Sequence, residues 1–215
     1  MRLWLKKSGN AVYTAHLDMN RLLSRAVRRA RLPLWYTEGF NPHPYLTFPL
    51  PLPLGQAGER EPVDLRLIGG MDNTQLQSAM NAALPQDVQV VAVSSPIKKA
   101  KEIAAARYHF SVRLNDEDEA RLLAGAINQA LCADELCAEK RSKSGIKTVN
   151  LLDFVHGYEL NQAGKLLELV CVLDAGSTRN LNAQLLWDTL RQRLGAPGAD
   201  ITRLALLCAD GTDFA

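Results

Sequence analysis

Two histidines are the side chains of this sequence best suited to acid–base chemistry at neutral pH. His16 stands at the start of a predicted helix, and His43 lies in the loop sequence EGFNPHP at residues 38–44. Because imidazole titrates near neutrality, the pair could act on a phosphodiester as general acid and base, with Asp18 as a third candidate. In the structural alternative, His16 covers the helix start and His43 orders its loop through hydrogen bonds. Asp18 would then form an ion pair with Arg21, one helical turn further on.

No ligand spacing in the sequence demands a metal ion. His16, Asp18 and Asp64 could in principle ligate one, but their positions follow no zinc-site pattern. The four cysteines lack a paired C-x-x-C spacing and mostly stand among apolar residues: Cys132, Cys137, Cys171 and Cys208. We therefore expect buried, reduced thiols, and neither a metal nor a cofactor.

A basic helix is predicted at residues 15–32, between a Thr14 N-cap and Pro33. Apolar residues recur there at three- and four-residue steps, so one face is apolar. The opposite face carries Arg21, Arg25, Arg28 and Arg29. Residues 1–54 hold eight basic and two acidic side chains, a net charge of +6 in a chain whose total is only +2. This local field favours a polyanion or an acidic protein surface as partner, whereas the alternative is a solvated helix face.

Two further segments are candidates for binding. In the loop that follows the basic helix, the candidates are Gly39, Phe40, Asn41 and His43. Two prolines restrict the backbone of this loop. A second basic segment, between a predicted helix and a strand, supplies Lys140, Arg141, Lys143 and Lys147. Basic loops that contain glycine suit phosphate contact, and the aromatic residues of the N-terminal part could stack on bases. Flexible hairpin connections would look the same as such a basic loop, and core packing explains most aromatic residues in any sequence.

The order of predicted elements indicates an α+β protein with two tandem ferredoxin-like (βαββαβ) subdomains, residues 1–95 and 107–215. In the first, strands and helices are expected at 2–7, 15–32, 34–37, 63–68, 74–84 and 88–93, with further extended residues at 45–48. Residues 94–106 form a predicted linker. The second series is expected at 108–114, 117–137, 147–160, 165–173, 181–194 and 201–208. No residue-level repeat accompanies the duplication, which rests on element order alone.

No apolar run is long enough to span a membrane, and the N-terminus lacks the apolar core of a signal peptide. We therefore expect a cytoplasmic protein with no membrane partner. The glycine motifs of nucleotide-binding loops and the nucleophile elbow of hydrolases are absent from the sequence.

Several motifs of the chain are shared with one known family. The N-terminal ones are His16-Leu17-Asp18, the helix end Arg28-Arg29-Ala30 with Leu32-Pro33, and residues 38–44. The later ones are Pro53-Leu54-Gly55, residues 147–150 and Gly176-Ser177. Together they resemble the radical-SAM-associated (radical-SAM-linked) protein family, a domain of unknown function. The chain departs from that family at Ala15, where Ser is common, and at Asn150, where Asp is common.

The resemblance implies a protein partner more than a reaction, because members of that family are encoded beside a radical SAM enzyme or fused to it. This chain lacks the C-x-x-x-C-x-x-C motif that holds a radical SAM cluster, so it is not that enzyme itself.

Three hypotheses remain. In the first, the chain is a non-catalytic accessory protein that binds RNA, or presents it for modification, for a radical SAM protein encoded nearby. In the second, it is a ribonuclease-like enzyme that uses His16 and His43. In the third, it is a pure protein-interaction module whose basic face meets an acidic surface of the radical SAM partner.

Overall fold

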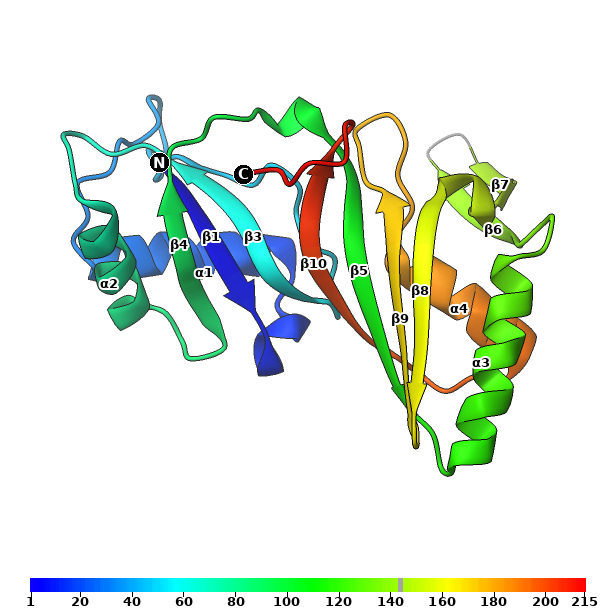
Figure 1. The fold of residues 1–215 in the computed structure, drawn as a ribbon. Helices are drawn as coiled ribbons and strands as arrows, with labels where there is room; N and C mark the ends of the chain where they lie inside the picture. The colour runs from blue at the N-terminus through cyan, green and yellow to red at the C-terminus, as the bar shows by residue number, and fades with distance from the viewer. Residues whose placement is uncertain (143–144) are drawn as a thin grey trace. The chain divides into compact units, whose positions relative to one another are not determined.

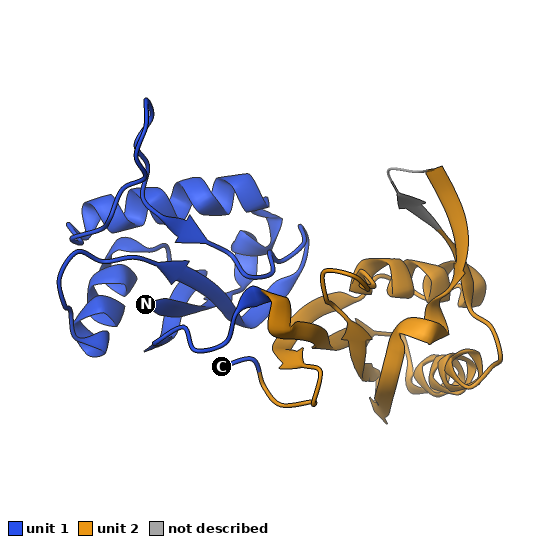
Figure 2. Cartoon of the chain, turned by 90° about the horizontal axis from the view of Figure 1, so that it is seen from above, with its two compact units in different colours: residues 1–100, 214–215 blue, residues 101–213 orange. Residues whose placement is uncertain are grey.

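The computed structural model describes residues 1–142 and 145–215 and shows an α+β protein. The chain forms two compact units, residues 1–100 with 214–215 (unit 1) and residues 101–213 (unit 2), coloured separately in Figure 2. A 3-10 turn, Ala100–Glu102, lies at the boundary between them in the sequence. The division of the chain into domains 1–95 and 107–215 stays a prediction.

Unit 1 is an antiparallel sheet with two α-helices. In chain order its elements are β1 (Arg2–Lys7), a 3-10 turn (Gly9–Tyr13), α1 (His16–Arg29), β2 (Leu46–Thr47), β3 (Ala57–Leu65), α2 (Asn73–Ala83) and β4 (Val88–Ser94). The strands lie in the order β4-β1-β3, and the short β2 pairs with β3. In Figure 1, α1 runs behind these strands.

The core of unit 1 forms because alternate strand residues and one stripe of α1 are apolar. Leu3 and Leu5 of β1 share a buried cluster with Val63 and Leu65 of β3. The stripe of α1 completes it with Met19, Leu23, Ala26 and Val27. The predicted apolar face of this helix is therefore confirmed.

The ends of α1 differ from the prediction. The helix begins at His16 rather than residue 15, its N-cap is Ala15, and no side chain caps it, so Thr14 is not the N-cap. It ends at Arg29 rather than residue 32, and Arg31 has a φ of 52°. The left-handed conformation of Arg31 stops the helix two residues before Pro33 could.

Unit 2 repeats the alternation of strands and helices. Its elements are β5 (Ile103–Arg113), α3 (Glu117–Leu131), β6 (Cys137–Ser142), β7 (Gly145–Asn150), a 3-10 turn (Leu151–Phe154), β8 (Val155–Ala163), β9 (Leu166–Asp174), α4 (Ala183–Leu194) and β10 (Asp200–Cys208). The main strands are antiparallel in the order β10-β5-β9-β8, and β6 and β7 form a separate two-stranded sheet. Phe110 of β5 stacks on Trp187 of α4 in the core, with ring centroids 5.7 Å apart.

Several other boundaries were predicted wrongly. The strand expected at 63–68 is β3, which begins at Ala57 and ends at Leu65. The strand expected at 34–37 consists only of isolated bridges at Leu34 and Tyr36. β5 starts at Ile103, inside the predicted linker. The helix expected at 117–137 ends at Leu131, and β6 follows. In its described residues, the second basic segment therefore consists of two paired strands, in which Lys140 lies opposite Lys147. Local composition does not reveal this pairing between strands.

The apolar stripe of α1 gives a matched pair of stability tests. Leu23 is fully buried, whereas Leu17 is 69% exposed on the same helix. Leu23→Ala should lower the free energy of unfolding by about 2–5 kcal/mol, because it removes buried methyl groups and leaves a cavity. Leu17→Ala should change it by no more than about 0.5 kcal/mol. Urea denaturation measures both, and equal effects would contradict the packing described for α1.

Candidate functional site

The four arginines of α1 form one exposed face, which we call the arginine face: Arg21, Arg25, Arg28 and Arg29. Their spacing places them within about 100° of arc, since consecutive residues turn by about 100°. Arg21 pairs with Asp18 at 2.9 Å, as the structural alternative for Asp18 expects, and both side chains are well exposed. Arg29 Nη2 donates to the carbonyl oxygen of Ala83 at 2.6 Å. Within the described residues, Arg25 and Arg28 have no ion-pair partner.

An open groove of about 630 Å³ runs along this face, between α1 and the end of α2. We call it the basic groove, and its lining residues are Thr14, Asp18, Arg21, Leu22, Arg25, Arg29, Ala83, Leu84 and Pro85. Three guanidinium groups therefore border a partly apolar surface. Such a groove suits a ligand that carries several negative charges and some apolar area.

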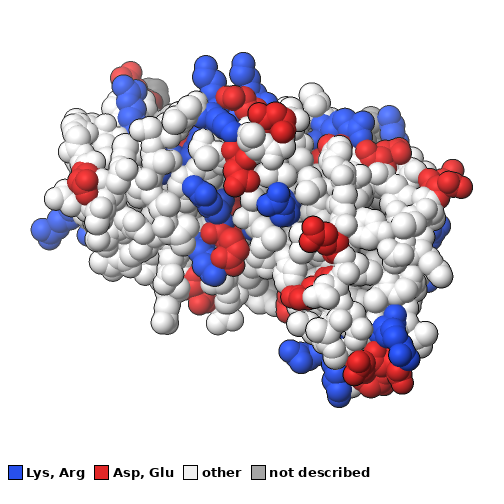
Figure 3. Space-filling view, in the orientation of Figure 1, with Lys and Arg blue, Asp and Glu red and all other residues white. Residues whose placement is uncertain are grey.

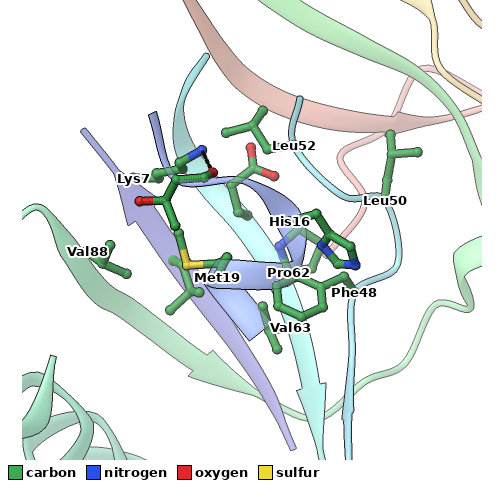
Figure 4. A pocket seen from close by; sticks show the side chains of 12 residues that line it. Lys7, His16, Met19, Phe48, Leu50, Leu52, Pro62, Val63 and Val88 are labelled. Atoms are coloured by element: carbon green, nitrogen blue, oxygen red, sulfur yellow. Dashed lines mark hydrogen bonds between the residues drawn. The ribbon is translucent and has the colours of Figure 1, made fainter. Parts of the chain in front are cut away.

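His16 lines a second cavity, the His16 pocket, with a volume of about 30 Å³ (Figure 4). The rings of His16 and Phe48 meet edge to face, with centroids 4.8 Å apart. Most of the wall is apolar: Leu5, Met19, Phe48, Leu50, Leu52, Pro62, Val63 and Val88. The polar groups are His16, Thr14, Lys7 and Glu61, and the last two are more than nine-tenths buried.

An irregularity in strand pairing places Lys7 and Glu61 at this pocket. Leu5 pairs with Glu61, but Lys7 pairs with Gly58, so β3 has one more residue than β1 between these pairs. This is the arrangement of a β-bulge, which re-aims side chains. Lys7 Nζ donates to the carbonyl oxygens of Val12 and Thr14 at 3.3 and 3.1 Å. The Glu61 side chain lies over Gly58, where a Cβ would come within 2.6 Å of its Cγ.

His43 belongs to a different structure, a hairpin-like arm at residues 35–45 seen as the light-blue loop at the upper left of Figure 1. Its Nδ1 lies 3.0 Å from Thr37 Oγ1 and 3.1 Å from the carbonyl oxygen of Asn41. The carbonyl oxygen of His43 also accepts from the Thr37 N–H at 2.9 Å. These bonds correspond to the structural alternative, in which His43 orders its own loop.

The tip of the arm is exposed and its base is packed. Gly39 has a φ of 122°, which favours glycine, and the neighbouring Phe40 is fully exposed. At the base, Trp35 and Tyr45 meet edge to face at 5.7 Å, and the Arg66 guanidinium lies 4.9 Å from the Trp35 ring centroid.

The structure does not gather the predicted catalytic residues in either cavity. His16 lines the His16 pocket, Asp18 lines the basic groove, and neither lining includes His43 or Asn41. The bridge between Tyr36 and Pro44 explains the difference, because it turns residues 37–43 into the end of an arm. The residues that sequence reasoning missed are Lys7 and Glu61, since a bulge leaves no periodic signal in the sequence.

The remaining candidates lie in unit 2. Lys140 and Arg141 belong to β6 and the exposed Lys147 to β7, whereas Lys143 lies outside the described residues.

The exposure of the cysteines differs from the prediction: Cys171 is buried, Cys132 is exposed, and Cys137 and Cys208 are intermediate. Burial raises the pKa of the Cys171 thiol to about 12. The described part of the chain contains no group of three or more His, Cys, Asp or Glu side chains placed to hold a metal ion.

A family model described as "Uncharacterized protein conserved in bacteria (DUF2344)" matches residues 1–183. The chain belongs to the DUF2344 family. The matched region includes α1, the arm, the basic groove and the His16 pocket. Among curated proteins, none matches the sequence.

One solved structure similar to this DUF2344 chain is titled "Crystal Structure of a Cbf5-Nop10-Gar1 Complex". The TM-score is 0.47 at 13% sequence identity, and the match covers 95% of this chain and 48% of the other. The DUF2344 chain thus spans about half the length of the chain that it matches there.

Charges on the side of the DUF2344 chain seen in Figure 3 are mixed. Lysine and arginine alternate there with aspartate and glutamate, without a broad field of one sign. In addition, none of the helices in the described residues is long and apolar enough to cross a membrane. On α1, four exposed arginines share one face, and one of them, Arg21, pairs with Asp18.

A charged cluster around Asp174 in unit 2 of the DUF2344 chain escaped sequence reasoning. Its Oδ1 lies 2.6 Å from His156 Nε2, and its Oδ2 accepts from Arg179 Nε at 2.9 Å. Burial alone would raise the pKa of Asp174, but hydrogen bonds from His156 and Arg179 and their positive charges outweigh burial and hold that pKa below its ordinary value. The Gly176-Ser177 motif lies between Asp174 and Arg179, so this cluster closes the turn that contains it.

The depressed pKa of Asp174 predicts a pH-dependent stability. The ionised Asp174 carboxylate contributes to the free energy of unfolding. This contribution is fully present above the pKa of an aspartate in the unfolded chain, and it is lost as the pH falls through the lower pKa of Asp174 in the folded protein. Asp174→Asn should lower the free energy of unfolding by about 1–3 kcal/mol at neutral pH, and the difference should shrink in acid. Denaturant titrations across this pH range measure it.

Asp118→Asn is the matched control for this prediction. Asp118 also pairs with an arginine, Arg121 at 2.7 Å, but both side chains are more than 70% exposed. Its substitution should change stability by less than about 1 kcal/mol, as is usual for exposed ion pairs. A loss for Asp174→Asn that is no larger, or that is independent of pH, would contradict a stabilising role for the cluster.

Proposed function

We propose that the chain is a non-catalytic accessory protein that binds RNA along the arginine face of α1. One observation carries this proposal: four exposed arginines share one helix face and three of them border an open groove. In the part of the chain that the structure describes, Asp18 is the one acidic side chain that pairs with this face, through its bond to Arg21. Phosphate contacts of this kind supply affinity without sequence readout.

The dimensions of α1 agree with a short stretch of RNA backbone. Arg21 and Arg29 are eight residues apart, a rise of ~12 Å at ~1.5 Å per residue. A stacked strand carries one phosphate per ~3.4 Å, so the arginine face spans roughly three to four phosphates.

We also propose that both units have the ferredoxin-like βαββαβ fold and form two domains, which meet in the sequence between residues 95 and 107. The strand orders support this fold, since β4-β1-β3-β2 and β10-β5-β9-β8 both place the fourth strand beside the first and the first beside the third. Sheets of this kind present a regular platform on which helices expose their outer faces.

The resemblance to the radical-SAM-associated family supports a second part of the proposal. The chain would present the bound RNA to a radical SAM protein encoded nearby. Co-purification of that protein and RNA with the tagged chain is the expected result. Recovery of the radical SAM protein without RNA would favour the pure protein-interaction module instead.

The salt dependence of RNA binding tests the arginine face. For three phosphate contacts to a single strand, the slope of log K against log salt concentration should be about −2, because each contact contributes ~0.7. Arg25→Gln, which changes an arginine that borders the groove, should reduce the slope by about 0.7 and weaken binding of all sequences alike. Fluorescence anisotropy with labelled oligoribonucleotides gives both quantities.

Arg121→Gln provides the control, since Arg121 is as exposed as Arg21 and also pairs with an aspartate three residues before it. It should bind RNA as the unmodified chain does. Binding that is absent, insensitive to salt, or equally weakened by Arg121→Gln would overturn the proposal. RNA cleavage that is lost in His16→Ala and His43→Ala would instead support the ribonuclease-like alternative.

A further inference from the structure

We propose that the His16 pocket selects a single cytosine base of the RNA whose backbone lies in the basic groove. This inference rests on the proposed function and adds sequence selectivity to it. Its determinant is Glu61, a buried carboxylate that sequence analysis did not single out.

The pocket and the groove adjoin at one residue. Thr14 lines both cavities, immediately before α1 begins at His16. Arg21, the nearest arginine of the face, is five residues beyond His16, a rise of only ~7.5 Å along the helix. A nucleotide whose phosphate contacts this end of the arginine face therefore has its base within reach of the pocket.

The size and walls of the pocket suit one flat ring. Its volume of about 30 Å³ exceeds the ~10–15 Å³ that a single water needs. This admits the edge of a six-membered ring but not a whole nucleoside, so the sugar stays outside. Figure 4 shows the rings of His16 and Phe48 together on one side of the pocket and Lys7 on the other. Aromatic and aliphatic walls of this kind hold unstacked bases in RNA-binding proteins.

The polar groups of the pocket discriminate between the two pyrimidines. A carboxylate accepts hydrogen bonds, so Glu61 suits the N4 amino group of cytosine and repels the O4 oxygen of uracil. Its two oxygens offer several acceptor sites, so contacts with the protein leave capacity for a ligand. Lys7 donates to two backbone carbonyls, which fixes a positive charge at the pocket wall.

The test compares short fluorescein-labelled oligo(rC) and oligo(rU) by anisotropy at neutral pH. The unmodified chain should bind oligo(rC) about tenfold more tightly, since one well-formed base contact contributes discrimination of about that size. Glu61→Gln should reduce the preference to less than about twofold, because an amide can either donate or accept. The variant should keep its affinity for oligo(rU) and its slope of log K against log salt concentration. Both results would show that the variant is folded.

Gly58→Ala tests the position of the carboxylate without changing the charge of the protein. A Cβ at Gly58 would overlap the Glu61 side chain and displace it. The variant should therefore lose the preference for oligo(rC) as Glu61→Gln does. Ala57→Ser, a polar change at the preceding position of β3, is the control and should keep it.

The outcomes separate this inference from the proposed function. Salt-sensitive binding of both oligomers with equal affinity would overturn the cytosine pocket and leave the arginine face in place. A preference for oligo(rC) that persists in Glu61→Gln would also overturn it. Binding of neither oligomer would overturn both proposals.

Discussion

The rest of unit 1 depends on how the apolar stripe of α1 packs against the sheet. Leu23, Ala26 and Val27 are almost completely buried against residues of β1 and β3. A helix has only one side to bury, so this contact decides that the four arginines face solvent. It also fixes the start of α1, which sets His16 beside Phe48 and makes Thr14 a border of both cavities. The electrostatic surface and the two cavities are thus consequences of a single hydrophobic contact.

Within that frame, the bulge between β1 and β3 changes the chemistry of the pocket. In a regularly paired strand, buried and exposed residues alternate strictly. An acidic side chain at a buried position of such a strand would lose its hydration, which costs a large amount of free energy. The extra residue of β3 brings Glu61 and Lys7 to the same small cavity, where two backbone carbonyls accept hydrogen bonds from Lys7. Gly58 is needed nearby because any side chain there would meet Glu61. Charged side chains are rarely buried unless they are paired, because burial removes their hydration. Those that line a cavity therefore indicate a binding site more strongly than exposed charged side chains do.

Local periodicity in the sequence was enough to predict the helices of both units and the exposed arginines, because helix faces depend on residue spacing alone. It failed wherever a feature depends on pairing between distant segments. β6 was taken for a helix end and a loop, since it is polar and only its pairing with β7 defines it, whereas the strand expected at 147–160 includes most of β7. His43 was a catalytic candidate because of its residue type, yet its side chain lies within hydrogen-bond distance of Thr37 and Asn41 in the same arm. Glu61 was overlooked because it lies in the part of β3 before residue 63, where no strand was expected. Asp174 was overlooked because its partners come from the neighbouring strand β8 and from the turn after β9.

The most direct test of the account is the location of bound RNA on the chain. Ultraviolet crosslinking of oligo(rC) to the intact protein, followed by mass spectrometric mapping of the crosslinked peptides, gives that location without any substitution. We expect crosslinks in α1 and in the segments that hold Phe48 and Glu61. Crosslinks confined to unit 2, for example to the β6–β7 hairpin with its paired Lys140 and Lys147, would contradict the claim that the arginine face of α1 is the RNA-binding surface.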